Sequence, residues 1–154
     1  MEKEYNFQPV ESIPAYFTYD EVFKGIEKIA NEEGYYIVNE KLFHDPGLCH
    51  NGKKEIIKKG LSLFFKGEIK YIVEFTGEDI HFKSERGRDF YRTVIKNPKK
   101  DILFESYNYH INNPESLSDE EDYSPPMQSQ TNLYSNDPLA KKLFEMIKNH
   151  YYKK

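Results

Sequence analysis

The feature that most constrains the fold is a run of alternating apolar and other residues between positions 61 and 83. The apolar side chains at every second position are Leu61, Leu63, Phe65, Ile69, Tyr71, Val73 and Phe75. A period of two is typical of strands with one buried face. A Lys66-Gly67-Glu68 loop and a two-residue Gly77-Glu78 turn would keep these apolar rows on the same face. We therefore predict a three-stranded antiparallel meander over 61–83, with Val73 buried near Phe65, Phe75 and Phe82.

Helical periodicity is clearest near the two ends of the chain. Thr18 and Glu21 have the spacing of a capping box, and Gly34 is a suitable stop signal, so the sequence predicts a helix between them. Asp137 is a good helix cap, and Pro138 suits the first helical position. A second helix is therefore predicted from there to the C-terminal residues. Each helix carries one apolar stripe that must be buried against another element.

The remaining segments complete a fold prediction. Residues 35–43 and 102–111 are rich in β-formers and predict strands. Residues 48–60 fit either a helical turn or a basic strand edge. For 85–97 we predict a short helix, although its β-branched run argues against one. Residues 112–137 lose all periodicity and predict a mobile acidic loop rich in Pro and Ser. The prediction for 1–154 is a single α+β domain, a mainly antiparallel sheet with an N-terminal and a C-terminal helix packed on one face.

Composition narrows the class of protein further. The 154 residues carry a net charge of -4, and none of their apolar runs reaches the ~18 residues of a membrane span. The acidic start lacks the cationic and apolar order of a signal peptide, and the single cysteine, Cys49, excludes an internal disulfide. We therefore expect a cytoplasmic protein without a membrane partner. An acidic chain with a pI near 5.8 also makes nucleic acid an unfavourable partner.

The arginines form the first candidate site. The chain uses lysine almost everywhere, yet all its arginines, Arg86, Arg88 and Arg92, fall within seven positions. A guanidinium can grip a carboxylate or phosphate through two parallel hydrogen bonds, which an ammonium cannot do. His81 and Lys83 are expected to border the same patch. The alternative is a solvated loop with ordinary surface ion pairs.

A second candidate is the segment that contains His44, Asp45, Cys49 and His50. Imidazole, carboxylate and thiolate all bind zinc, but this spacing matches no common zinc pattern. The Asp-Pro-Gly sequence at its centre is typical of a turn. No phosphate-binding glycine loop or nucleophile motif occurs either. The sequence thus predicts no metal and no cofactor.

A third candidate joins Asp45 to Glu68 and Lys70. Their order is similar to the Asp…Glu-x-Lys signature of metal-dependent nucleases of the restriction-endonuclease-like family. The resemblance implies that the two carboxylates hold a divalent ion while the lysine positions or activates water. The alternative is that Glu68 and Lys70 are solvent-facing residues beside a hairpin loop.

The leading functional prediction is a non-enzymatic module that binds another protein, such as an inhibitor or immunity-type protein that neutralises a basic enzyme. Its candidate contact surfaces are the arginine patch, the tyrosine-rich sheet face and the acidic run Asp119, Glu120, Glu121 and Asp122. The alternatives are the small nuclease or phosphodiesterase described above and an anion- or nucleotide-binding sensor built on the arginines.

Overall fold

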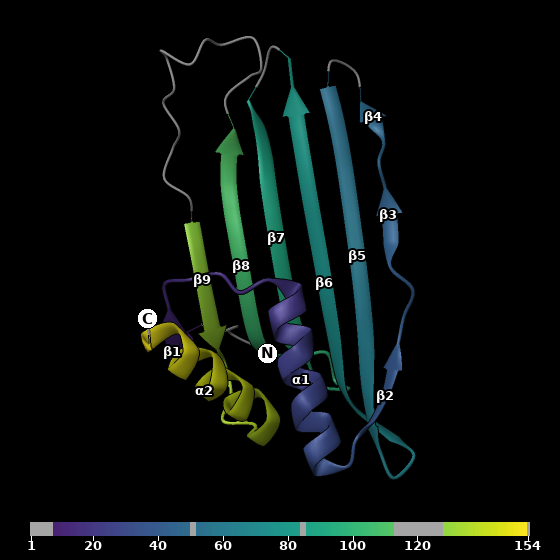
Figure 1. The fold of residues 1–154 in the computed structure, drawn as a ribbon, viewed down its shortest axis with the longest axis vertical. Coiled ribbons are helices and arrows are strands. Elements are labelled where there is room, and N and C mark those ends of the chain that lie inside the picture. The colour runs from purple at the N-terminus through teal and green to yellow at the C-terminus, as the bar shows by residue number, and fades with distance from the viewer. Residues whose placement is uncertain (1–7, 50–51, 84–85, 113–127, 154) are drawn as a thin grey trace, which may run out of the picture.

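One antiparallel sheet organises the whole structure (Figure 1). The computed structural model describes residues 8–49, 52–83, 86–112 and 128–153. Its strands are β1 (Glu11–Ile13), β2 (Tyr36–Asn39), β3 (Phe43–Asp45), β4 (Leu48–Cys49), β5 (Gly52–Phe65), β6 (Glu68–Phe82), β7 (Gly87–Lys96), β8 (Ile102–Asn112) and β9 (Gln128–Leu133). The helices are α1 (Tyr19–Glu33) and α2 (Pro138–Tyr152). The strand order is β1-β9-β8-β7-β6-β5-β2, and β3 and β4 also pair with β5. The predicted α+β class with a mainly antiparallel sheet and two terminal helices is confirmed.

The two faces of the sheet differ, and we name them by their residues. Leu61, Val73, Ile95 and Phe104 lie opposite one another on successive strands, and each is at most 1 % exposed. They join one hydrophobic cluster with the buried side chains of both helices. We call the face that carries these four residues the core face and the opposite one the outer face. In the view of Figure 1, both helices lie in front of the lower part of the sheet.

Both helices begin at the residues that the sequence indicates. Thr18 caps α1, with its hydroxyl accepting a hydrogen bond of 3.3 Å from the backbone of Glu21. Gly34 ends α1 in a left-handed conformation with φ 83°. Asp137 caps α2 and also accepts a hydrogen bond of 2.8 Å from the Tyr71 hydroxyl on β6. That last contact ties the start of α2 to the sheet. Neither described helix is long and apolar enough to cross a membrane.

The predicted meander is wrong in one important respect, because it contains two long strands and not three. The predicted Gly77-Glu78 turn lies inside β6, paired with β5 on one side and β7 on the other. A glycine is needed here for space: a Cβ atom on Gly77 would lie 2.9 Å from the ring of Tyr91 and 3.0 Å from that of Phe75. The β5–β6 turn contains only Lys66 and Gly67, both with positive φ, which suits a two-residue hairpin.

The predicted helix at 85–97 is also wrong, because all of β7 lies within this segment. Thr93, Val94 and Ile95 are buried between β6 and β8, where branched side chains pack well. The strand at 102–111 is confirmed as β8, and the ambiguous stretch 48–60 contains β4 and most of β5.

Two further segments differ from their predictions. The predicted strand 35–43 is divided into β2 and the start of β3, which pair with β5 in registers that differ by one residue. Within 112–137, where the sequence predicts a loop, residues Gln128–Leu133 form β9 between β1 and β8. Positions 113–127 of that segment lie outside the described residues.

Candidate functional site

Beyond the hydrophobic cluster, the core face carries a row of acids and a histidine. Glu55, Asp79, Asp89 and His110 lie directly opposite one another on β5, β6, β7 and β8. Each lies an even number of residues from a buried core-face position, so the four side chains project from that same face. We call these four residues the carboxylate row. Neighbouring strands are about 4.8 Å apart, so the row extends about 14 Å across the sheet.

Asp79 and Asp89 form the central pair of the carboxylate row. Like charges that face each other directly across two strands destabilise a sheet. Burial raises the pKa of Asp79 above its ordinary value of 3.8, and the neighbouring carboxylates of Asp89 and Glu55 raise it further, whereas a hydrogen bond from Tyr91 lowers it. Among the described residues, the buried Oδ1 atom of Asp89 has no hydrogen-bond partner. The centre of the row therefore brings two carboxylates together, and one of their oxygen atoms makes no hydrogen bond within the described residues.

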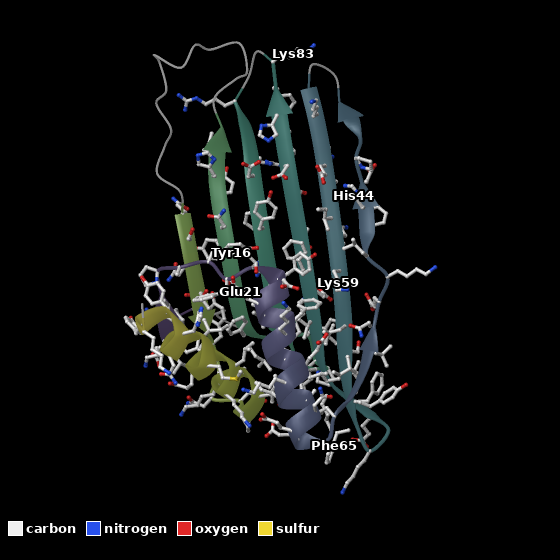
Figure 2. All side chains as sticks on the ribbon, viewed as in Figure 1. Tyr16, Glu21, His44, Lys59, Phe65 and Lys83 are labelled. Atoms are coloured by element: carbon white, nitrogen blue, oxygen red, sulfur yellow. The ribbon has the colours of Figure 1, made fainter. Side chains whose placement is uncertain are left out.

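Three of the five histidines of the chain contact these carboxylates. His44 Nε2 lies 2.8 Å from Glu55 Oε1, and Figure 2 shows His44 beside the upper part of the sheet. His81 Nε2 lies 3.4 Å from Asp89 Oδ1, and His110 Nδ1 lies 3.8 Å from Asp89 Oδ2. The last two distances are too long for strong hydrogen bonds. Protonation of these histidines would reduce the negative charge of the site.

Tyr91 connects the carboxylate row to the hydrophobic cluster. Its hydroxyl donates a hydrogen bond to Asp79 Oδ1. Its ring stacks on Phe75 at 6.4 Å and lies 6.3 Å from the ring of Tyr16. Burial and the hydrogen bond to Asp79 raise the pKa of Tyr91, so the hydroxyl remains a donor over the physiological pH range. The packed ring thus fixes the position of the Asp79 carboxylate.

The row is accessible at its Glu55 end and more enclosed at Asp89. The side chain of Glu55 is 44 % exposed, whereas that of Asp89 is 22 % exposed. A cavity of about 230 Å³ lies beside the accessible end, lined by Pro46, Gly47, Lys53, Lys54, Glu55, Asp79 and His81. Within the described part of the chain, the His, Cys, Asp and Glu side chains form no group of three that could hold a metal ion. The acids are spread along a line, which suits an extended cationic partner.

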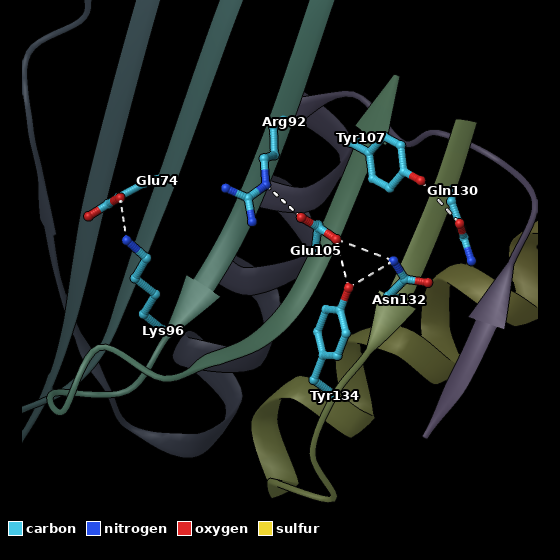
Figure 3. A network of polar contacts seen from close by, with 8 residues as sticks. All are labelled: Glu74, Arg92, Lys96, Glu105, Tyr107, Gln130, Asn132 and Tyr134. Atoms are coloured by element: carbon cyan, nitrogen blue, oxygen red, sulfur yellow. Dashed lines mark hydrogen bonds and ion pairs between the residues drawn. The ribbon is translucent and has the colours of Figure 1, made fainter. Parts of the chain in front are cut away.

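The predicted arginine patch is divided between different environments. Arg92 donates a hydrogen bond of 2.6 Å to Glu105, which also accepts hydrogen bonds from Asn132 and Tyr134 (Figure 3). Arg88 lies further along β7 on the same outer face, 3.8 Å from Glu78. Arg92 therefore belongs to a structural network, while Arg88 keeps a long and exposed ion pair.

Of the other residues predicted for that patch, Arg86 lines one cavity together with Arg88, whereas His81 and Lys83 lie elsewhere. His81 follows a residue that faces outward, so it projects from the core face and contacts Asp89 there. Lys83 is exposed at the upper end of the sheet, just beyond β6 (Figure 2). Arg86 is exposed beside the start of β7. The acidic run Asp119, Glu120, Glu121 and Asp122 lies outside the described residues.

The residues of the nuclease-like motif are not brought together. Asp45 lies opposite Ile56 on β5, whereas Glu68 lies opposite Phe65. Ile56 and Phe65 are nine positions apart on β5, a distance of about 30 Å along a strand. Lys70 forms an ion pair of 3.1 Å with Glu68 at the exposed hairpin end. Asp45 therefore cannot share one metal ion with Glu68 in this fold.

The comparisons with known proteins give no family for this chain. No protein-family model matches it, and no curated protein and no solved structure matches it either. The site must therefore be judged from its own geometry. The sequence reasoning missed Glu55, Asp79, Asp89 and His110. Had Gly77 been assigned to a continuous strand, the alternation that predicts Val73 in the core would also have placed Asp79 on the core face.

The charge of Asp79 leads to a prediction about pH. Because folding raises the pKa of Asp79, the folded state binds a proton at this carboxylate more tightly than the unfolded state does. The stability that this protonation contributes is present at low pH and is lost as the pH rises through the pKa of the folded state. We expect Asp79→Asn, which keeps an acceptor for Tyr91, to be more stable than wild type at pH 7 by about 0.5 kcal/mol or more. Urea unfolding should show this advantage shrink at pH 4, and an equal advantage at both pH values would contradict the prediction.

Proposed function

We propose that this chain is a non-enzymatic binding module that receives a basic protein partner on its carboxylate row. The observation that carries this proposal is the central pair, Asp79 and Asp89, two carboxylates that face each other across β6 and β7, with only a long contact of 3.4 Å from His81 to Asp89 Oδ1. An ammonium or guanidinium placed above the two carboxylates would reduce their repulsion and donate charge-assisted hydrogen bonds to their accessible oxygen atoms. The Asp89 side chain is 22 % exposed, so such a contact can form at the surface.

The dimensions of the row support a protein as the source of these cations. Carboxylate-bearing positions follow one another at about 4.8 Å across the strands. Basic side chains four residues apart on a helix are separated by about 5–6 Å at their Cβ atoms. A basic helix that crosses the strands could therefore place one cation at each of Glu55, Asp79 and Asp89. The net charge of -4 would also favour encounter with such a partner.

An inhibitor or immunity-type protein that neutralises a basic enzyme fits this proposal. Such a protein needs no reaction chemistry of its own, only a rigid surface of complementary charge. Here the three acids project from three adjacent paired strands, and Tyr91 holds one of these acids in place. A surface built on a sheet loses little conformational entropy when it binds.

The decisive experiment compares three versions of the protein as bait in an extract of the native host. Wild type is expected to retain a stoichiometric basic protein, whose affinity is then measured with purified components. Asp79→Asn with Asp89→Asn should weaken binding about tenfold or more, as expected when charged contacts are lost. The matched control, Glu27→Gln with Glu33→Gln, removes the same charge from exposed positions of α1 and should bind like wild type.

Two results would overturn this proposal. Equal binding by the two double variants would show that only net charge matters and that the row is not the contact surface. Retention of an acidic partner by the wild-type protein would contradict the predicted chemistry. Circular dichroism of each variant is the check that its fold is intact.

A further inference from the structure

A second cavity lies on the other side of the sheet from the carboxylate row. Its volume is about 380 Å³, within the range of small-molecule sites. The residues that line it are Ile80, Phe82, Arg86, Gly87, Arg88, Tyr109 and Ile111. Ile80 lies opposite Arg88 on β7, and Arg88 lies opposite Ile111 on β8, so these three side chains share the outer face. We call this cavity the outer pocket.

The outer pocket combines an apolar surface with two cationic groups. Ile80 is only 8 % exposed, and Phe82, Tyr109 and Ile111 are partly buried. The ring of Tyr109 packs edge-on against Phe90 at 6.0 Å, which holds it in place. Arg86 and Arg88 are the exposed members of the lining. A ligand with an apolar body and an anionic head would match both parts of this surface.

The state of the arginines indicates which of them can bind a ligand. The side chain of Arg88 is 55 % exposed, and the contact of its guanidinium with Glu78 is 3.8 Å long. Such a pair contributes little and leaves donors for another acceptor. Arg92, in contrast, is held by Glu105 at 2.6 Å within the network of Figure 3. In a chain that otherwise uses lysine, two arginines beside an apolar cavity provide the planar donors that a carboxylate needs.

From this arrangement, we infer that the outer pocket binds a small aliphatic monocarboxylate. The hydrocarbon part would lie on Ile80, Phe82 and Ile111, and the carboxylate would accept hydrogen bonds from Arg86 and Arg88. This site is independent of the proposed protein-binding function, since it lies on the opposite face and shares no residue with the carboxylate row. Either proposal can fail without affecting the other.

The test uses octanoate as the probe, with acetate and octanamide as matched compounds. Titration followed by methyl NMR is expected to shift the signals of Ile80 and Ile111 with octanoate. Acetate lacks the apolar body and octanamide lacks the charge, so both should bind at least about tenfold more weakly. Arg86→Lys with Arg88→Lys keeps the net charge and should also weaken octanoate binding about tenfold.

The control Arg92→Lys makes the same chemical change outside the pocket, on the same face, and should leave octanoate binding unchanged. Thermal unfolding establishes that each variant is folded. Absence of shifts at Ile80 and Ile111 in the wild-type protein would overturn the inference. Equal affinity for octanoate and octanamide, or equal binding by the folded double-lysine variant, would also overturn it, because the arginines would then have no role.

Discussion

Replacing Val73 by Asp is expected to abolish the cooperative unfolding transition of this protein. Val73 is 0 % exposed, lies between Leu61 and Ile95, and belongs to the hydrophobic cluster that includes both helices. An unpaired carboxylate at this position would cost several kcal/mol, because it would be buried within a hydrophobic cluster. That cost is comparable with the ~5–15 kcal/mol that stabilises an ordinary domain.

The adjacent residue provides a matched control for this substitution. Ile72 is on the outer face of the same strand, opposite Ser62 and Lys96, and is only partly buried. Ile72→Asp should therefore retain a cooperative transition in urea, followed by circular dichroism. If Val73→Asp unfolded like wild type, or if Ile72→Asp were the more damaging change, the assignment of the two faces would be wrong.

Local signals predicted the helices well. Thr18, Gly34 and Asp137 act through contacts within a few residues, so their roles can be recognised in the sequence alone. The alternation around Val73 is similarly local and correctly placed Val73 and Phe75 on the buried face. The prediction was wrong for Phe82, because β6 continues without the expected turn and Phe82 therefore lies on the outer face. In the helices and around Val73, the conformation that the local sequence favours is also the one that the tertiary structure requires.

The errors came from residues whose role depends on distant strands. The segment 85–97 has apolar residues at helical spacing, yet the neighbours β6 and β8 make it a central strand. The Gly77-Glu78 sequence is typical of a turn, but Gly77 lies within a strand, where its lack of a side chain leaves space for the rings of Tyr91 and Phe75. A single sequence does not show which strands will flank a segment, so these two assignments required the structure.

The candidate site was hidden for the same reason. Glu55 and His110 are 55 residues apart and become neighbours of Asp79 and Asp89 only through three strand pairings. No motif spacing could indicate such a row. The arginines, in contrast, are close in sequence, but the contact with Glu105 gives Arg92 a role different from that of Arg88 on the same face. Proximity in sequence was a poor guide to the composition of a site on this sheet.

Gly77→Val is the second substitution with a large expected effect. The sign of its effect on stability distinguishes two explanations for the presence of a glycine at this position. If Gly77 were only a weak strand residue, valine would stabilise β6, because branched residues favour strands. The structure predicts the opposite, since the new Cβ atom would lie 2.9 Å from the Tyr91 ring and 3.0 Å from the Phe75 ring.

Relieving these contacts requires Tyr91 to move, and its hydroxyl would then lose its position beside Asp79. We expect Gly77→Val to lower the free energy of unfolding by about 1–3 kcal/mol, the usual cost of overpacking. Thr76→Val, one position earlier and on the outer face, should change stability much less. Urea unfolding of the two variants, with NMR signals of Tyr91 to detect its displacement, is the measurement. A gain in stability for Gly77→Val would show that the rings adapt without cost, and the packing explanation for this glycine would then be wrong.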